Sequence, residues 1–125
     1  MKKTVFFVLI LLIGCGENLQ EYTKAENALD AGREFINACL TGDFAKAAFF
    51  SDSRAGENLK LQEIERKYRL KDKEERQQYR TASINIREVK ELNDSITLIY
   101  FSNSVDKVSD SLAVVKQKDN WRVKL

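Results

Sequence analysis

The strongest constraint on the fold is a change in hydrophobic spacing near Arg80. Before it, apolar residues recur at steps of three and four, which is the spacing of one helix face. After it, apolar residues alternate with polar ones, beginning with Ala82, Ile84 and Ile86, as expected for strands with one buried face. Helices that all precede the strands predict an α+β fold, with the helices packed on one face of an antiparallel sheet.

The first helix is expected to follow a capping box. Thr23 is the predicted N-cap, and Glu26 lies three residues later. The helix should run to about Leu40 and end at Gly42, which suits the left-handed conformation of a helix end. Its predicted apolar stripe is Ala25, Ala28, Leu29, Gly32, Phe35, Ile36 and Cys39.

Two more helical segments are predicted before the strands. Asp43 is expected to cap a short helix over residues 44–50. A third helix begins near Glu57, and its apolar pattern fades beyond Leu70. The charged stretch 66–80 fits either one continuous helix or a helix followed by a loop, so about three helices are expected.

Four strands complete the predicted curved sheet. The alternation slips by one residue near Arg87-Glu88, which indicates a bulge. Residues 95–102 are apolar on both faces and should form the most buried strand. Residues 112–117 and 121–125 form a closing hairpin, and in its last strand Trp121, Val123 and Leu125 should point inward, with Arg122 and Lys124 outward.

The N-terminal segment has the features of a secretory signal. Two lysines precede an apolar run of nine residues, Val5 to Ile13, followed by Gly14 and Cys15. A membrane-spanning helix needs about 20 apolar residues, so this run is too short to cross a bilayer. A plain signal peptide is expected to end in an A-x-A-like site, and no such pair of alanines lies near residue 14.

The tetrapeptide Leu12-Ile13-Gly14-Cys15 resembles the lipobox of bacterial lipoproteins. The resemblance implies a signal peptide over 1–14, lipid attachment at Cys15, a tether over 15–22, and one domain over 23–125. Two or more acyl chains hold a protein on a membrane durably. Gly16 stands where an aspartate would suggest inner-membrane retention. A cell-envelope protein anchored in the outer membrane is therefore expected.

Charge and residue usage exclude several classes of function. The chain has 21 Lys and Arg against 19 Asp and Glu, and the signal segment holds two of the lysines and no acid. The remaining chain is formally neutral, which argues against nucleic acid as a partner. Histidine is absent from the sequence, and with it the commonest general base and metal ligand. We predict neither a cofactor nor a metal site.

The order of elements, with the Thr41-Gly42-Asp43 break and the terminal run Asp119-Asn120-Trp121-Arg122-Val123, resembles the nuclear-transport-factor-two-like superfamily. It is most similar to the small lipoproteins of uncharacterised function within it. The resemblance implies a cone-shaped domain in which the bent sheet and the helices enclose a cavity. Members include isomerases, dehydratases, small-molecule carriers and domains that only mediate contacts, so the fold does not select a function.

Candidate site residues are few. Tyr68 and Tyr100 are the tyrosines whose side chains are expected to face inward. An enzyme of this fold would need a carboxylate beside the hydroxyl of one of them. The acids Asp94, Asp106, Asp110 and Asp119 fall instead on polar faces or in turns and lack the spacing of a calcium loop. Cys39 and Trp121 are interpreted as core residues.

A non-catalytic domain is therefore expected, which binds a partner protein or a small apolar ligand near the membrane. The alternative is an isomerase or dehydratase-like enzyme that uses the cavity. A cavity filled by the protein's own side chains would favour a protein partner, whereas an open cavity of several hundred Å³ would favour a ligand. The seven basic residues of 66–80 are interpreted as a solvated face, with anionic headgroups as the other possibility.

Overall fold

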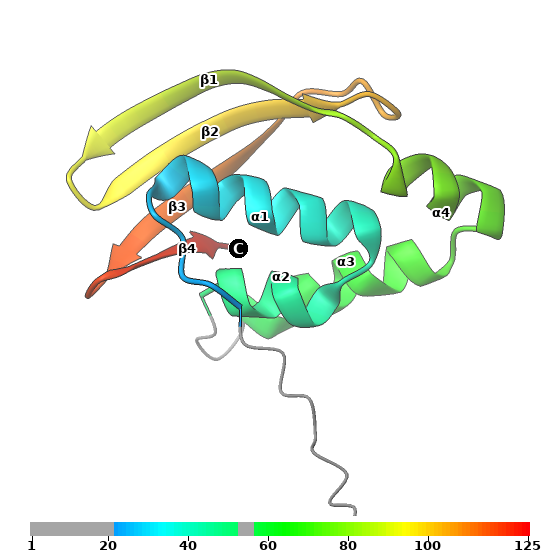
Figure 1. Ribbon diagram of the computed structural model, residues 1–125, viewed down its shortest axis with the longest axis horizontal. Coiled ribbons are helices and arrows are strands. Elements are labelled where there is room, and N and C mark those ends of the chain that lie inside the picture. Colours follow the sequence, from blue (N-terminus) through cyan, green and yellow to red (C-terminus); the bar gives the residue numbers. More distant parts are fainter. Residues whose placement is uncertain (1–21, 53–56) are drawn as a thin grey trace, which may run out of the picture.

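The computed structural model describes residues 22–52 and 57–125, and it confirms the predicted α+β fold (Figure 1). The signal segment 1–14, Cys15 and most of the tether lie outside the described residues. The helices are α1 (Ala28–Thr41), α2 (Phe44–Phe50), α3 (Glu57–Arg69) and α4 (Lys73–Arg80). The strands are β1 (Ile84–Asn93), β2 (Ile96–Asn103), β3 (Asp110–Gln117) and β4 (Asn120–Lys124). They form one antiparallel sheet in the order β1-β2-β3-β4.

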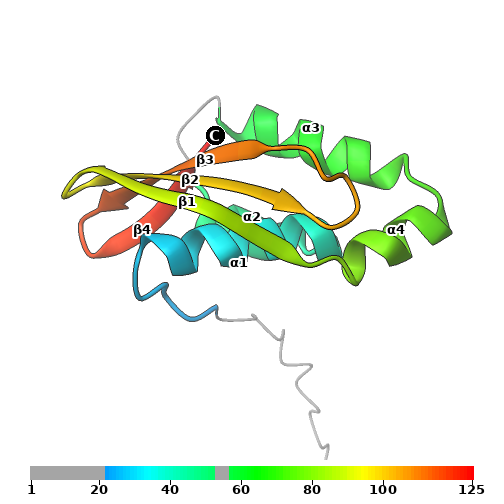
Figure 2. The same ribbon diagram turned by 90° about the horizontal axis from the view of Figure 1, so that it is seen from above.

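The core lies between α1 and one face of the sheet, which arches over the helix (Figures 1 and 2). Phe35 of α1 packs here with Ile99, Val114 and Val123, which are fully buried. Gly32 allows the close approach, because a Cβ at this position would lie 2.4 Å from Ile99 Cδ1. The predicted apolar stripe of the first helix therefore does face the sheet.

The first helix begins later than predicted. Asn27, not Thr23, is the N-cap, and its side chain accepts a hydrogen bond of 2.8 Å from Asp30 N. Asp30 Oδ2 in turn accepts one from Glu26 N at 3.0 Å. This reciprocal pair satisfies two backbone donors at the helix start. The Thr23–Glu26 capping box was wrong because Asn27 and Asp30 offer the same chemistry one turn later.

The break between α1 and α2 is confirmed as predicted. Gly42 ends α1 with φ +77°, and its backbone N–H bonds to the carbonyl of Ala38. Asp43 caps α2 by accepting a hydrogen bond of 3.1 Å from Lys46 N. After α2, Asp52 N donates to the carbonyl of Val123 at 2.8 Å, so the chain covers part of the β4 edge.

The charged stretch 66–80 contains the end of α3, a short break and the whole of α4, so both predicted alternatives were wrong. Asp72 interrupts the helical run with an extended conformation (φ −72°, ψ 175°) and caps α4 by accepting a bond of 2.9 Å from Glu75 N. An aspartate in this position competes with helix continuation and favours a new helix start. The run Asp72 to Glu75 is itself a capping signal that the sequence analysis did not use.

The sheet confirms the predicted bulge and corrects the predicted orientation of Tyr100. The register between β1 and β2 shifts between Ile86 and Glu88. β2 is the most buried strand, but Tyr100 lies between the buried Ile99 and Phe101 with 36% of its surface exposed, so it faces away from α1. Arg122 pairs with Val115 on the face opposite the buried Val123, as predicted, and its Nη1 donates to the carbonyl oxygen of Phe49 at 2.5 Å. The described helices cover only one face of the sheet, which leaves the Tyr100 side uncovered (Figure 2).

Candidate functional site

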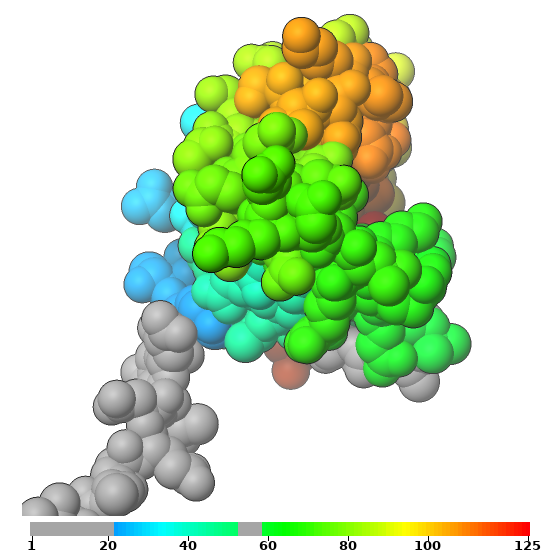
Figure 3. Space-filling view, turned by 90° about the vertical axis from the view of Figure 1, so that its right-hand side faces the viewer, coloured from blue at the N-terminus to red at the C-terminus, as the bar shows by residue number. Residues whose placement is uncertain are grey.

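A cavity of about 390 Å³ lies between α1, α3, α4 and one end of the sheet. Figure 3 views this end of the molecule, where α4 stands between α3 and the β2–β3 loop. Each layer contributes apolar side chains to the lining: Phe35, Ile36, Leu40, Ile64, Phe101, Leu112 and Leu125. The volume falls within the range of about 300–1,000 Å³ that is usual for small-molecule sites.

The polar lining is organised around one carboxylate. Tyr79 of α4 donates its hydroxyl hydrogen bond to Asp106 Oδ1, and Asn103 Nδ2 donates to the other oxygen at 3.1 Å. Asn103 Oδ1 also accepts from the backbone N–H groups of Val105 and Asp106 at 3.0 and 2.8 Å. The Asn103 side chain thus shapes the loop that holds Asp106 opposite α4.

The Tyr79–Asp106 bond fixes the protonation of the tyrosine. The hydrogen bond to Asp106 and partial burial raise the pKa of Tyr79 to about 12. At neutral pH, Tyr79 therefore keeps its proton and gives it to Asp106 as a hydrogen bond. The one proton of the phenol is directed at Asp106. This bond connects α4 to the β2–β3 loop across the cavity.

Two lysines also line the cavity. Lys71 Nζ lies 4.5 Å from the centre of the Tyr79 ring, a cation–π contact. Its backbone carbonyl accepts a hydrogen bond of 3.0 Å from Arg76 Nε. Lys67, one helical turn earlier, supplies the second cation. With Asp106 and Asp110 as the acidic side chains of the lining, the formal side-chain charges of the cavity balance.

Tyr68 lines the cavity as predicted, but within residues 22–52 and 57–125 no carboxylate accepts a hydrogen bond from it. Its hydroxyl is buried without a hydrogen-bond partner, and a Cβ at Gly42 would lie 2.6–2.7 Å from the end of its ring. Phe44 meets the same ring edge-on, with centroids 5.6 Å apart. Tyr100, the second predicted hydroxyl, lies on the other face of the sheet and outside this cavity.

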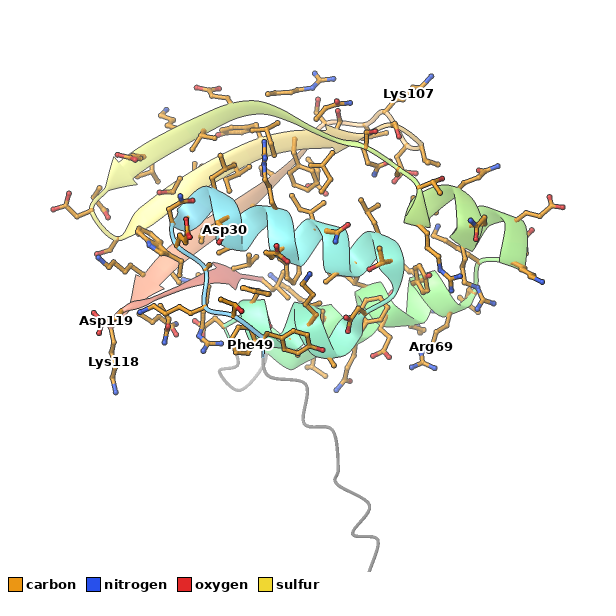
Figure 4. The ribbon with its side chains drawn as sticks, in the orientation of Figure 1. Asp30, Phe49, Arg69, Lys107, Lys118 and Asp119 are labelled. Carbon is orange, nitrogen blue, oxygen red and sulfur yellow. The ribbon has the colours of Figure 1, made fainter. Side chains whose placement is uncertain are left out.

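The predicted acids separate into two groups. Asp94 and Asp119 lie in hairpin turns, and Figure 4 places Asp119 at the opposite end of the molecule from the β2–β3 loop that carries Lys107. Asp106 and Asp110 are exposed, as predicted, with Asp106 in a turn, but both also line the cavity, which the sequence analysis did not foresee. Among residues 22–52 and 57–125, no three His, Cys, Asp or Glu side chains are grouped as a metal site would require.

The two predicted core residues are only half-buried. Trp121 packs against the core, and Lys116 Nζ lies 5.6 Å from its ring centre. Cys39 packs against the core and also lines the cavity. Burial raises the pKa of the Cys39 thiol to about 12, so it is neutral at physiological pH.

Comparison with known proteins adds no relative. No family model, curated protein or solved structure matches the chain significantly. In the part of the chain that the structure describes, no helix has the length and apolarity to cross a membrane. The resemblance to the nuclear-transport-factor-two-like superfamily therefore stays a prediction, and the site is interpreted from the chain's own residues.

Sequence reasoning missed the polar pair at the centre of the site. Tyr79 and Asp106 are 27 residues apart and belong to different elements. Tyr79 lies in a stretch without a clear apolar pattern, and Asp106 lies in a polar loop. One local signal was available, because Asn103-x-x-Asp106 is an arrangement in which an asparagine side chain turns a loop.

Proposed function

We propose that this chain is a lipoprotein of the cell envelope whose domain binds a small apolar ligand without changing it chemically. The observation that carries the proposal is the open cavity of about 390 Å³. A filled interior would have favoured a protein partner instead. Half of its lining residues are apolar, and the polar half includes the hydrogen-bonded group of Tyr79, Asp106 and Asn103, so the cavity offers an apolar contact surface together with groups that can orient a ligand.

The proposed anchor supports a site close to the membrane. Lipid attachment at Cys15 would leave a tether of seven residues, 16–22, which reaches at most about 25 Å when fully extended. The described chain begins at Tyr22, whose ring packs against Phe49 of α2 with centroids 5.4 Å apart. The domain would therefore remain within reach of molecules that partition into the outer membrane.

The alternative, an isomerase or dehydratase-like enzyme, gains no support from the site. It needs a carboxylate beside the hydroxyl of Tyr68 or Tyr100 at the cavity. Tyr68 has a buried hydroxyl without a partner, and Tyr100 lies outside the cavity. The tyrosine–carboxylate pair that does line the cavity, Tyr79–Asp106, holds its proton up to about pH 12. Proton transfer at neutral pH would require a group of intermediate pKa.

The test of binding uses the full chain, lipidated and held in phospholipid nanodiscs. If Cys15 carries lipid, Cys39 is the only thiol, so its alkylation by monobromobimane reports on the cavity. We expect native mass spectrometry to release a bound apolar molecule, and the neutral probe N-phenyl-1-naphthylamine to slow alkylation of Cys39. Unchanged alkylation at saturating probe, together with no released molecule, would contradict a binding function.

A matched pair of variants makes the test specific for the cavity. Ile64 and Gln62 both belong to α3, but Ile64 lines the cavity and Gln62 is exposed. Ile64→Trp should block the site and abolish the effect of the probe, while Gln62→Trp should retain it. The anchor is tested separately, because Cys15→Ser should abolish incorporation of labelled palmitate and release the protein from membranes.

A further inference from the structure

The cavity continues into a second pocket along α3. This pocket has a volume of about 520 Å³ and is lined at its far end by Leu59, Lys60 and Lys124. It shares four lining residues with the cavity: Ile64, Ser111, Leu112 and Leu125. The two hollows therefore adjoin at these four residues and form one cleft between α3 and the end of the sheet that carries Leu112 and Leu125.

The cleft is elongated along α3. Its wall on α3 extends from Leu59 to Tyr68, which is about 14 Å at the helical rise of 1.5 Å per residue. Leu59 is 67% exposed at the open end, whereas Phe35 at the inner end is buried. An extended acyl chain fills such a shape along its length, but a compact ring system does not.

The charges differ between the two ends. At the inner end, Lys67 and Lys71 balance Asp106 and Asp110. At the open end, the cationic side chains are Lys60 and Lys124, and the one acidic side chain of the lining is Glu63. Arg66 forms a two-pronged ion pair with that carboxylate, at 2.6 and 2.9 Å. The two lysines therefore leave a positive charge at the open end.

We propose that the cleft holds a single acyl chain that ends in an anionic group. The anionic group lies between Lys60 and Lys124, and the chain passes Ile64 and Leu112 to end beside Phe35. This inference rests on the proposed ligand-binding function and names its ligand class. Fatty acids and anionic lysophospholipids share this chemistry, so both are included in the test.

The experiment follows protection of Cys39 from monobromobimane in the full chain in nanodiscs. Oleate, lysophosphatidylglycerol and oleyl alcohol are compared. The alcohol has the chain of oleate without its charge. We expect oleate, lysophosphatidylglycerol or both to reach half-protection at a concentration about tenfold below that of oleyl alcohol, which is the effect of two exposed charge contacts.

Lysine variants test the position of the anionic group. Lys60→Met with Lys124→Met keeps the apolar stems and should raise the half-protecting concentration of the anionic ligand about tenfold, with no effect on oleyl alcohol. Lys90→Met, at an exposed position of β1, is the matched control. It should leave the half-protecting concentrations of both the anionic ligand and oleyl alcohol unchanged. Thermal unfolding of each variant checks that it folds.

The outcomes separate this inference from the proposed function. If none of the three amphiphiles protects Cys39 and the neutral probe also fails, the binding function itself is wrong. If oleyl alcohol protects Cys39 as well as oleate and lysophosphatidylglycerol do, the site binds apolar molecules whatever their charge. The same conclusion follows if the double lysine variant has the half-protecting concentrations of the wild type. Either of these last two results would overturn the inference and leave the proposed function standing.

Discussion

At the scale of single residues, Gly42 shows how one backbone position supports the site. It ends α1 with a positive φ, and it leaves room for the ring of Tyr68 on α3. Any side chain here meets two costs, a strained backbone and a steric clash. Gly42 therefore both ends α1 and allows the Tyr68 ring to take its place in the cavity wall.

Gly42→Ala should lower the free energy of unfolding by about 2 kcal/mol or more. The left-handed conformation disfavours alanine, and the new Cβ would lie 2.6–2.7 Å from the Tyr68 ring. Urea unfolding followed by circular dichroism measures the change. Adding Tyr68→Leu, which removes the ring, should recover part of the loss. A Gly42→Ala variant as stable as the wild type would contradict this account of the position.

Cys39 gives a pH-dependent test of its surroundings. Burial raises the pKa of the thiol to about 12, and the thiolate is the form that reacts. Below that pH the reactive fraction grows tenfold per pH unit, so the rate of alkylation should keep rising between pH 7 and 10 without a plateau. A free cysteine levels off above about pH 8.5, and the same profile at Cys39 would show that its surroundings do not suppress ionisation.

The sequence predicted residue roles only where the signal is local. Gly42 and Asp43 were assigned correctly, because each acts on backbone groups within four positions of itself. Thr23 was assigned wrongly because a nearby residue with equivalent chemistry, Asn27, provides the cap. The pair of Tyr79 and Asp106 depends on how two distant elements meet, which no local pattern encodes.

At the scale of elements, α4 is held by few contacts. It has eight residues and none of them is buried, and an isolated helix shorter than about 12 residues is marginal in water. Its connections to the rest of the protein include the Tyr79–Asp106 bond and the packing of the Tyr79 ring beside Ile36 and Phe101. The stability of α4 should therefore respond to the loss of a single hydrogen bond.

Tyr79→Phe should increase amide hydrogen exchange in α4 about fivefold while leaving α1 unchanged. The variant keeps the ring and loses the hydroxyl, and one such bond contributes about 1 kcal/mol. Exchange followed by mass spectrometry measures peptides that cover 73–80. Tyr100→Phe is the matched control, because Tyr100 lies on the uncovered face of the sheet. Equal exchange in both variants would show that the Tyr79 bond does not hold α4.

The sequence predicted the order of helices and strands better than it predicted where one helix ends and the next begins. The change of period at Arg80 separates helices from strands, and the slip at Arg87-Glu88 is a bulge in the structure. The stretch 66–80 was uncertain because charged residues surround its few apolar ones, so periodicity carries little information there. Capping chemistry at Asp72 decided the outcome.

At the scale of the whole molecule, the described chain has one layer of helices on one face of a sheet (Figure 2). The sequence predicted this layering because burial patterns report which face of each element is covered. The burial patterns did not predict the cleft, and a cavity was expected only from the resemblance to a fold family. The cleft depends on the distance between α3 and β3, which the local pattern of neither element determines. Packing of the complete chain determines that distance.

A ligand in the cleft should stabilise the whole domain, because it would bridge α3 and the sheet in the folded state alone. A ligand at a concentration 100 times its dissociation constant adds about 2.7 kcal/mol to the free energy of unfolding. Each 1 kcal/mol raises the melting temperature of a domain near 100 residues by about 4 °C or more. Saturating oleate should therefore raise the melting temperature of the full chain in nanodiscs by about 10 °C. Ile64→Trp should remove this increase and Gln62→Trp should preserve it. An equal increase in both variants would place the ligand outside the cleft.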